Sequence, residues 1–347
     1  CVRKAVNEML GSLAEDAGIR REDVFQVCVV GNTCMHHLFL GISPASLVHA
    51  PYTPAVSERL VLNAGDYGLA VQERAELIML SDIAGYVGAD TCGCLLAIRQ
   101  DQQEEISLMI DIGTNGEMVL GNRERMVTCS TAAGPAFEGA KIECGMRGAA
   151  GAVDHVKYED GKWNYTTVGN KPAVGLCGSG LIDLVAGLLE AGMLDENGVL
   201  RSGQEKQGVF ILVPPERGGN ERGVYLTQKD LGEVQLAKAA IAAGIQMLME
   251  RLGITEDDIC SVYIAGAFGN YMDPVSAGKI GLLPATLVKK VKPVGNAAGE
   301  GAKIALVNEK EMLEMDELVR KIEFVELAAS ADFQDHFIDE LGFETGE

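Results

Sequence analysis

Aromatic side chains and positive charges are both scarce in this sequence. Aromatic residues make up 5% of the 347 positions and include a single tryptophan, so there are few flat side chains on which sugars or single-stranded bases stack. Lysine and arginine number 29 against 50 aspartates and glutamates, which gives a net charge of −21. Because a chain this acidic repels phosphate backbones, we expect no nucleic acid among its partners.

Long hydrophobic runs are also missing. Residues 181–194 form the longest candidate, and Asp183, Gly187 and Glu190 interrupt it well short of the roughly 20 apolar residues that span a bilayer. No signal-peptide pattern opens the sequence. We therefore expect a cytoplasmic protein with no membrane partner. The sequence begins without methionine and inside a helical pattern, from which we expect a piece of a longer protein.

No two cysteines have the C-x-x-C spacing, although the sequence contains nine. An odd number of cysteines scattered through apolar segments indicates buried free thiols in a reducing cytoplasm and not a disulfide framework. Cys92 and Cys94 alone lie close together, in an apolar helical pattern where packing is favoured over metal binding. Because an iron–sulfur cluster needs about four clustered thiolates, we expect no redox centre in this sequence.

What the sequence does contain is enough apolar surface for two lobes. Hydrophobic residues make up 47% of the positions, and 347 residues exceed the usual length of one domain. The acidic stretch 101–105 separates two patterns. We expect residues 1–105 to be the remainder of a first lobe, with helices at 2–14, 35–40 and 83–98 and strands at 24–30 and 77–80.

Residues 106–347 are predicted to form the second lobe. Three short segments joined by tight turns, 106–111, 116–121 and 125–130, are typical of an antiparallel meander. The later pattern consists of two strands within 153–168, a loop-rich insertion around 201–222, helices at 181–189, 230–252 and 296–307, strands at 261–265 and 291–294, a short segment at 322–327 and a terminal helix to about 341. This order predicts an α/β fold of the ribonuclease-H type, with mixed sheets flanked by helices.

The segment from Leu108 to Leu120 carries the sharpest chemical signal. An apolar strand brings Asp111 to its end, and a glycine-rich turn leads back into a second strand. Backbone N–H groups of such a turn approach phosphate oxygens with no Cβ in the way, and the carboxylate holds Mg²⁺, largely through water, or orients the nucleophile. The alternative is an ordinary hairpin with an Asn-Gly turn. The candidate nucleotide-binding residues are Gly113, Thr114, Asn115, Gly116 and Glu117, with Asp111 as catalytic residue and metal ligand.

Two later glycine-rich segments extend this candidate site. The first opens a helix, whose N-terminus attracts anions, and the second ends a strand, where an adenosine can lie against the backbone. Taken alone, the first is also explained as a helix cap and the second as a strand–loop–helix connection. In this order the three segments together predict a nucleotide site. The added residues are Gly178, Ser179 and Gly180 in the first segment, and Gly266, Ala267, Gly269 and Asn270 in the second.

Four other side chains are weaker candidates. Glu138, in a turn, is predicted to sense Mg²⁺ or water as a second catalytic residue, the alternative being a capping role. Arg147, among glycines, is a candidate phosphate contact. His36 and His37 are adjacent in a helical pattern, so they point about 100° apart and do not easily share one metal ion. We expect one of these histidines to pack and the other to lie on the surface.

Seven segments together resemble one family. They are Gly31–Leu38, Val87–Asp90, Asp111–Glu117, Ala132–Ala140, Cys177–Asp183, Ala265–Asn270 and Val294–Ala298. The three nucleotide segments are similar to the phosphate, connecting and adenosine motifs of the ASKHA superfamily, which includes acetate and sugar kinases, heat-shock chaperones and actin. The whole set, over about residues 24–340, is similar to the C-terminal region of the reductive activators of corrinoid proteins.

The resemblance implies an ATP-dependent reductive activase that returns Co(II) corrinoid proteins to the Co(I) state for methyl transfer in anaerobes. It implies ATP and Mg²⁺ as cofactors. It implies as partners a corrinoid protein and a low-potential electron donor acting through an iron–sulfur domain, and it is compatible with a homodimer. The iron–sulfur domain and a first D-x-G-T segment do not occur in this sequence, so we expect them in a missing N-terminal part. Asn115 and Glu117 also stand where other ASKHA phosphate loops often have glycines or basic residues.

The residues alone leave two other functions open. A small-molecule kinase of the ASKHA type needs a catalytic carboxylate that faces a substrate hydroxyl or carboxylate, and phosphorylated product without a corrinoid partner would favour it. A non-catalytic nucleotide-binding interaction module would bind nucleotide without any turnover, even with its partner present.

Overall fold

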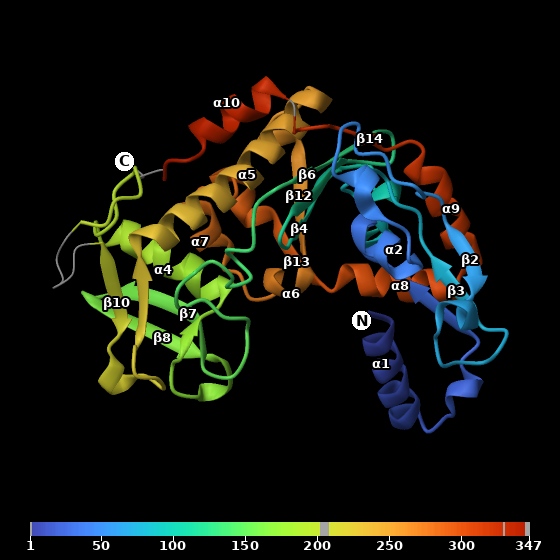
Figure 1. Cartoon of the computed structure of the whole chain (residues 1–347). Helices are drawn as coiled ribbons and strands as arrows, with labels where there is room; N and C mark the ends of the chain where they lie inside the picture. Colours follow the sequence, from blue (N-terminus) through green and yellow to red (C-terminus); the bar gives the residue numbers. More distant parts are fainter. Residues whose placement is uncertain (1, 202–207, 329, 344–347) are drawn as a thin grey trace. The chain divides into compact units, whose positions relative to one another are not determined.

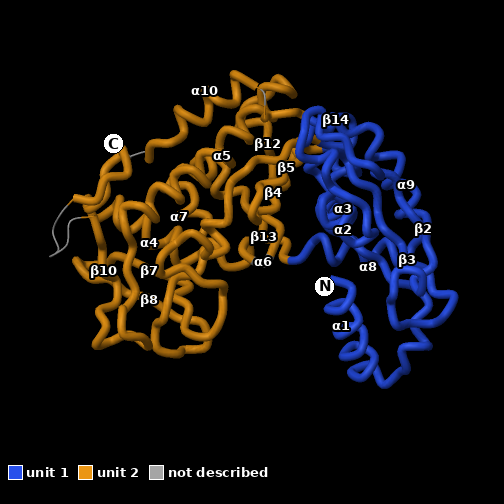
Figure 2. The backbone as a smooth tube through the Cα atoms, viewed as in Figure 1, with its two compact units in different colours: residues 1–104, 122–128, 296–324 blue, residues 105–121, 129–295, 325–347 orange. Residues whose placement is uncertain are grey.

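Two compact units make up the chain in the computed structural model, which describes residues 2–201, 208–328 and 330–343 apart from the side chain of residue 267. Unit 1 contains residues 1–104, 122–128 and 296–324, and unit 2 contains residues 105–121, 129–295 and 325–347 (Figure 2). Each unit is therefore built from three separate stretches of sequence.

Unit 1 contains a three-stranded sheet and helices from distant parts of the sequence (Figure 1). Its elements are α1 (Val2–Ala17), β1 (Gln26–Val29), α2 (Thr33–Leu40), β2 (Leu60–Asn63), β3 (Glu76–Met79), α3 (Ala89–Ile98), α8 (Ala297–Val307), α9 (Glu309–Val319), β14 (Glu323–Phe324) and the 3-10 helices η1 (Arg21–Asp23), η2 (Pro44–Leu47), η3 (Ala64–Tyr67) and η4 (Gln100–Gln102). In the order β1-β3-β2, β3 runs parallel to β1 and antiparallel to β2. Phe39, Leu77 and Met79 are buried in the core.

Helices α3 and α8 pack closely because each has a glycine at the contact. A side-chain carbon on Gly301 of α8 would collide with the backbone of Gly93 in α3, and one on Gly93 would lie 2.6 Å from the carbonyl oxygen of Ala298. A larger residue at either position would force the helices apart. Cys92 and Cys94 are fully buried in α3, which confirms the predicted packing role. Burial raises the pKa of the Cys92 thiol.

Unit 2 contains the longest described helix and part of the sheet with the most strands. Its elements are β4 (Ile106–Ile112), β5 (Gly116–Gly121), β6 (Met126–Thr131), β7 (Ala152–Glu159), β8 (Lys162–Thr167), η5 (Val168–Asn170), β9 (Gly175–Leu176), α4 (Gly178–Glu190), β10 (Val209–Val213), η6 (Pro215–Arg217), β11 (Val224–Thr227), α5 (Gln228–Leu252), η7 (Glu256–Asp258), β12 (Ile259–Ala265), α6 (Gly266–Gly269), α7 (Pro274–Lys279), η8 (Ala285–Lys290), β13 (Val291–Gly295) and α10 (Ala331–Asp339).

The six-stranded sheet has the order β13-β12-β4-β5-β6-β14. β4 runs antiparallel to β5 and parallel to β12, and β12 runs parallel to β13. A second sheet has the order β8-β7-β9, and β10 and β11 form a hairpin. Mixed sheets with helices define an α/β fold, as the sequence predicts. The carboxyl ends of β4 and β12 lie together, because these neighbours run in the same direction.

Helix α5 packs against β5 through glycines on both elements. A side-chain carbon on Gly244 of α5 would collide with the side chain of Met118 on β5, and one on Gly116 of β5 would lie 3.2 Å from Ile241 Cγ1 of α5. The capping box of Thr227 and Asp230 starts the helix, and Gly253 ends it with a positive φ of 69°. This long helix therefore supports the strand that follows the first glycine turn.

The structure confirms the predicted meander, the strand pair within 153–168 and the terminal helix, and it differs from the prediction at several other places. Helix α3 begins at Ala89 and not at residue 83, because Asp82 accepts the Ala89 N–H at 2.9 Å and residues before it run as a turn. The insertion around 201–222 contains strand β10, while its residues 202–207 lie outside the described residues. Strand β2 and helix α9 have no counterpart in the prediction.

Candidate functional site

The first glycine turn lies where β4 meets both of its neighbours. Asp111 is the cross-strand neighbour of Glu117 on β5 and of Ala265 on β12. The Gly113 N–H donates a 2.9 Å hydrogen bond to the Asn115 carbonyl oxygen and closes the turn. The predicted hairpin is therefore present, and its carboxylate lies beside the residue that precedes the third glycine segment.

Gly266 brings backbone directly against Asp111. It follows β12 with a φ of +86°, and a side-chain carbon built there would lie 2.9 Å from Asp111 Oδ1. Glycine is therefore required at position 266 for two reasons. The positive φ disfavours a side chain, and the Asp111 carboxylate leaves no room for one. Behind it, Gly269 packs on Ile264, and the exposed Asn270 places its side-chain nitrogen 3.1 Å from the side-chain position of Gly295. The side chain of Ala267 lies outside the described residues.

Glu138 is joined to the first glycine turn. Its Oε1 accepts a 2.7 Å hydrogen bond from the Thr114 hydroxyl, and the same oxygen lies 3.7 Å from the side-chain position of Gly113. The loop of residues 132–140 thus reaches back to the end of β4. A threonine and a glutamate that are 24 residues apart in sequence form one polar surface next to Asp111.

The start of helix α4 joins this assembly through two aromatic rings. Phe137 and Phe268 are stacked, with ring centroids 5.7 Å apart and planes inclined by 13°. A side-chain carbon on Gly178 would collide with the Phe137 carbonyl oxygen and lie 2.7 Å from Phe268 Cε2. All three glycine segments therefore come together within unit 2, with the 132–140 loop between them.

The side-chain positions of the α4 segment are filled by protein. The Ser179 hydroxyl donates to the Asp154 carbonyl oxygen at 2.8 Å, and the side-chain position of Gly180 coincides with the backbone of Val153. What remains for an anion is the backbone N–H groups in the first turn of this 13-residue helix, which have no acceptor within the helix.

The other turn residues differ in exposure. Thr114 is exposed and Asn115 half-buried, whereas Gly116 is buried beneath α5. Glu117 is 9% exposed, and its Oε1 accepts a 3.2 Å hydrogen bond from the Ser130 hydroxyl. A ligand of the turn therefore meets the 113–115 backbone and Thr114 before it meets Glu117.

His36 and His37 are both buried, so the expectation that one lies on the surface is wrong. His37 is held at both ring nitrogens, with Nδ1 2.7 Å from the Thr33 carbonyl oxygen and Nε2 accepting the Ala55 N–H at 2.9 Å. His36 Nδ1 lies 3.1 Å from Asp82 Oδ2, and its Nε2 has no hydrogen-bond partner within the described part of the chain. Burial raises the pKa of Asp82, although His36 opposes the shift.

A second histidine–aspartate pair, which the sequence analysis missed, lies next to the α4 segment. Asp183 Oδ2 is 3.1 Å from His155 Nδ1 and accepts the Val156 N–H at 3.2 Å. Burial raises the pKa of Asp183, with Ser276, Val156 and His155 acting in the opposite direction. The available signal was the position of Asp183 one helical turn after Ser179, which puts both side chains on the same face toward β7.

Metal ligands and membrane spans were searched over the described residues. No group of three or more His, Cys, Asp or Glu side chains there is arranged to hold a metal ion. No described helix is both long and apolar enough to cross a bilayer.

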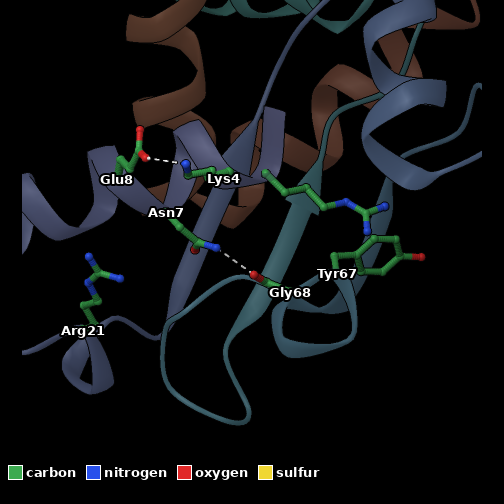
Figure 3. Close-up of a pocket in the computed structure, with 7 residues that line it drawn as sticks. Lys4, Asn7, Glu8, Arg21, Tyr67 and Gly68 are labelled. Atoms are coloured by element: carbon green, nitrogen blue, oxygen red, sulfur yellow. Dashed lines mark hydrogen bonds and ion pairs between the residues drawn. The ribbon is translucent and has the colours of Figure 1, made fainter. Parts of the chain in front are cut away.

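A separate cavity of about 430 Å³ lies within unit 1, between α1 and the end of η3 (Figure 3). Figure 3 shows Lys4 facing Glu8, at 3.7 Å, and Asn7 donating a 2.8 Å hydrogen bond to the Gly68 carbonyl oxygen. Arg3, which also lines the cavity, donates to the Phe39 carbonyl oxygen at 2.9 Å. These contacts join the first helix to α2 and to the end of η3.

Comparison with known proteins places the chain in a family. Residues 105–347 match the model for the C-terminal ASKHA domain of RACo proteins, and residues 1–103 match the model for the RACo middle region. The chain therefore contains an ASKHA domain, which defines a class of α/β proteins. It belongs to the RACo family.

The individual relatives agree with this assignment. A corrinoid activation enzyme, RamQ of Eubacterium limosum, is 34% identical over 97% of this chain and 59% of its own length. The Co(II) methylated amine-specific corrinoid protein reductase of Methanosarcina barkeri is 29% identical over 80% of this chain and 54% of its own length. The solved structure of a reductive activator for corrinoid, iron–sulfur protein has a TM-score of 0.90 at 37% identity, over 99% of this chain and 56% of that one. This chain thus spans less than two thirds of each relative.

Proposed function

We propose that this chain is the ATP-binding and ATP-hydrolysing part of a reductive activator that returns Co(II) corrinoid proteins to the Co(I) state. The observation that carries the nucleotide site is the meeting of three glycine segments around Asp111, Glu138 and the Phe137–Phe268 pair. The corrinoid role is supported by the names of the relatives. The ribonuclease-H-type topology and the division into two ASKHA lobes at residue 105 are part of this proposal.

The residues present fit MgATP. Glycine replaces a side chain where backbone borders Asp111, and at Gly134, with a φ of +77°, no described atom lies within 4 Å of the side-chain position. Such open backbone suits phosphate oxygens. When bound, Mg²⁺ supplies charge neutralisation at the phosphates.

Each part of the site has a task in this proposal. Asp111 holds Mg²⁺, largely through water, and Glu138 orients the attacking water while it keeps Thr114 in place. The backbone of residues 113–116 and the first turn of α4 bind phosphates, and the segment from Gly266 to Asn270 borders the adenosine. Carboxylates are suited to both of the first two tasks, because an ionised carboxylate accepts hydrogen bonds from water and binds hard cations.

Nucleotide turnover and corrinoid reduction are coupled in this proposal through affinity. Reduction of Co(II) to Co(I) is uphill for a low-potential donor, so the free energy of nucleotide binding and hydrolysis has to bias the partner toward a state that is more easily reduced. The electron comes from an iron–sulfur domain outside these 347 residues. We place no redox centre in this chain, and reconstitution with iron and sulfide followed by metal analysis is expected to give no stoichiometric iron.

Isothermal titration calorimetry with MgATP tests the nucleotide site. We expect Gly266→Val to abolish binding, because the added side chain meets Asp111, and Gly113→Val to do the same at the turn. Gly232→Val is the matched control, since no described atom lies within 4 Å of the side-chain position of Gly232 in α5. Unchanged affinity in both site variants would refute the site.

Turnover is tested separately. With a cognate corrinoid protein present, we expect phosphate release from ATP by the wild type and a large loss in Glu138→Gln, which keeps the acceptor oxygen for Thr114 but removes the charge. Transfer of the terminal phosphoryl group to a small acceptor molecule, in the absence of any corrinoid protein, would favour a kinase instead.

A further inference from the structure

The loop that follows residue 140 contacts the 132–140 loop on one side and the strand before α4 on the other. A side-chain carbon on Gly139 would lie 2.5 Å from Met146 N and 2.6 Å from Met146 O, so the peptide between residues 146 and 147 lies against Gly139. On the other side, the Met146 N–H donates a 2.8 Å hydrogen bond to the Leu176 carbonyl oxygen, just before α4. Backbone contacts therefore place residue 147 between Glu138 and the start of α4.

Arg147 lies at this position, and its guanidinium forms no ion pair with any other described residue. The side chain is exposed, and within the described residues it makes no hydrogen bond or ion pair. Its neighbour Gly148 has no described atom within 4 Å of its side-chain position, so the loop borders open space. The nearest cation in sequence, Lys141, already pairs with Glu233 at 3.1 Å.

Charge balance gives this arginine a task. The proposed site presents the carboxylates of Asp111, Glu117 and Glu138, and a nucleoside triphosphate brings further negative charge even with Mg²⁺ bound. Desolvating so many like charges is unfavourable without a cation. A guanidinium has a planar fork of donors that matches phosphate oxygens in pairs, and it stays charged at every physiological pH.

We propose that Arg147 binds the terminal phosphate of the nucleotide and is a phosphate-binding residue of this site. The inference rests on the proposed nucleotide function. It assigns to the glycine-flanked loop of residues 145–151 the role of bringing a cation to the end of the phosphate chain. The positions of Glu138 and Arg147 along the chain are then fixed by backbone contacts of Gly139 with Gly145 and Met146.

Calorimetry with ATP, ADP and AMP in the presence of Mg²⁺ tests the assignment. Arg147→Ala is expected to weaken ATP binding about 10- to 100-fold, as for loss of a charge-assisted hydrogen bond, and to leave AMP binding unchanged. Arg147→Lys keeps the charge and is expected to restore part of the ATP affinity. Arg201→Ala is the matched control, because Arg201 is also exposed and lies beyond the far end of α4.

The outcomes separate this inference from the function on which it rests. Equal ATP affinity in Arg147→Ala and the wild type overturns the role of Arg147 while the nucleotide site stands. An equal loss for ATP, ADP and AMP overturns the assignment to the terminal phosphate. Unchanged ATP affinity with weaker binding of a corrinoid protein makes Arg147 a docking residue instead. Failure of the wild type to bind any nucleotide overturns both proposals.

Discussion

Within the described residues, the pairs His36–Asp82 and His155–Asp183 have the same nitrogen–oxygen distance but differ in their exposure to solvent. In both, an Nδ1 lies 3.1 Å from an aspartate Oδ2. In unit 1 the side chains of His36 and Asp82 are 7% and 1% exposed, whereas in unit 2 the His155 side chain is 45% exposed and that of Asp183 only 3%. The His36–Asp82 pair is enclosed in protein, whereas in the other pair a buried aspartate contacts a half-exposed imidazole.

Two hydrogen bonds of equal length therefore need not contribute equally to the free energy of unfolding. A buried N–H group that loses its acceptor cannot form a hydrogen bond to water instead. Removing one side chain of the enclosed pair therefore lowers the free energy of unfolding substantially. The imidazole of the open pair can exchange its aspartate for water. The enclosed pair therefore stabilises the junction of α2 with the start of α3, while the open pair positions β7 against α4.

Asp82→Ala is expected to have the largest effect on stability. It leaves the Ala89 N–H and His36 Nδ1 without an acceptor in a buried site, which costs about 3 kcal/mol of unfolding free energy. Urea unfolding of the chain measures the loss. Asp66→Ala is the control, because Asp66 is exposed and no described donor bonds to its carboxylate; a change within about 0.5 kcal/mol is expected there. Equal losses in the two variants would contradict the comparison.

Asp183→Ala is expected to cost less, about 2 kcal/mol, because the Val156 N–H loses its acceptor away from solvent whereas the half-exposed imidazole of His155 can turn to water. It differs from Asp82→Ala in a second readout. Since Asp183 lies one turn after the glycine segment of α4, we expect MgATP affinity in calorimetry to fall several-fold in this variant and to stay unchanged in folded Asp82→Ala. Weaker nucleotide binding in both variants to the same extent would show a general effect of destabilisation.

His155→Ala is expected to cost at most about 1 kcal/mol, as for a solvent-exposed pair. A double-mutant cycle of His155→Ala and Asp183→Ala gives the coupling between the two side chains. We expect a coupling well below the total cost of Asp183→Ala, because the Val156 N–H accounts for the remainder. A coupling equal to that total would mean that the imidazole is the only partner that matters.

The smallest expected effect is a pH dependence. Burial raises the pKa of Asp82 in the folded state above its ordinary value, so the native chain binds this proton more tightly than the unfolded chain does. Stability from this group is therefore gained as the pH falls through the raised pKa, and it is fully present below the ordinary aspartate value of about 3.9.

Urea unfolding of the wild type and of Asp82→Asn, from about pH 7 to about pH 4, measures this gain. The free energy of unfolding of the wild type should improve relative to the variant as the pH falls. Because Asp90 and Asp183 also have a raised pKa, only the difference between the two proteins reports on Asp82. A difference that does not change with pH would contradict the assignment.

Local pattern explains which parts of the fold were predictable. The meander from β4 to β6 and helix α5 follow from alternation, tight turns and helical periodicity, which are set by residues close in sequence. The prediction placed the start of α3 too early, because residues 83–88 are mostly apolar and continue the pattern of the helix. Their non-helical conformation depends on Asp82 and on contact between Gly88 and the backbone of Asn32. Hydropathy contains no information on such a contact.

His36 and His37 show the same limit for side chains. Helical periodicity separates their directions by about 100°, and from a helix alone one of them would face solvent. The surrounding segments decide otherwise, since both rings are buried, with Asp82 beside His36 and the Ala55 N–H beside His37.

By itself the sequence determined the three glycine segments and the strand or helix end to which each belongs, because those patterns depend on a few consecutive residues. Only the tertiary structure decided which of them meet. Asp111 borders Gly266 because β4 and β12 are parallel neighbours, and Thr114 reaches Glu138 because the 132–140 loop folds back over the turn. Such contacts join residues far apart in the chain, and they follow from strand order and packing, which no local pattern of residue types specifies.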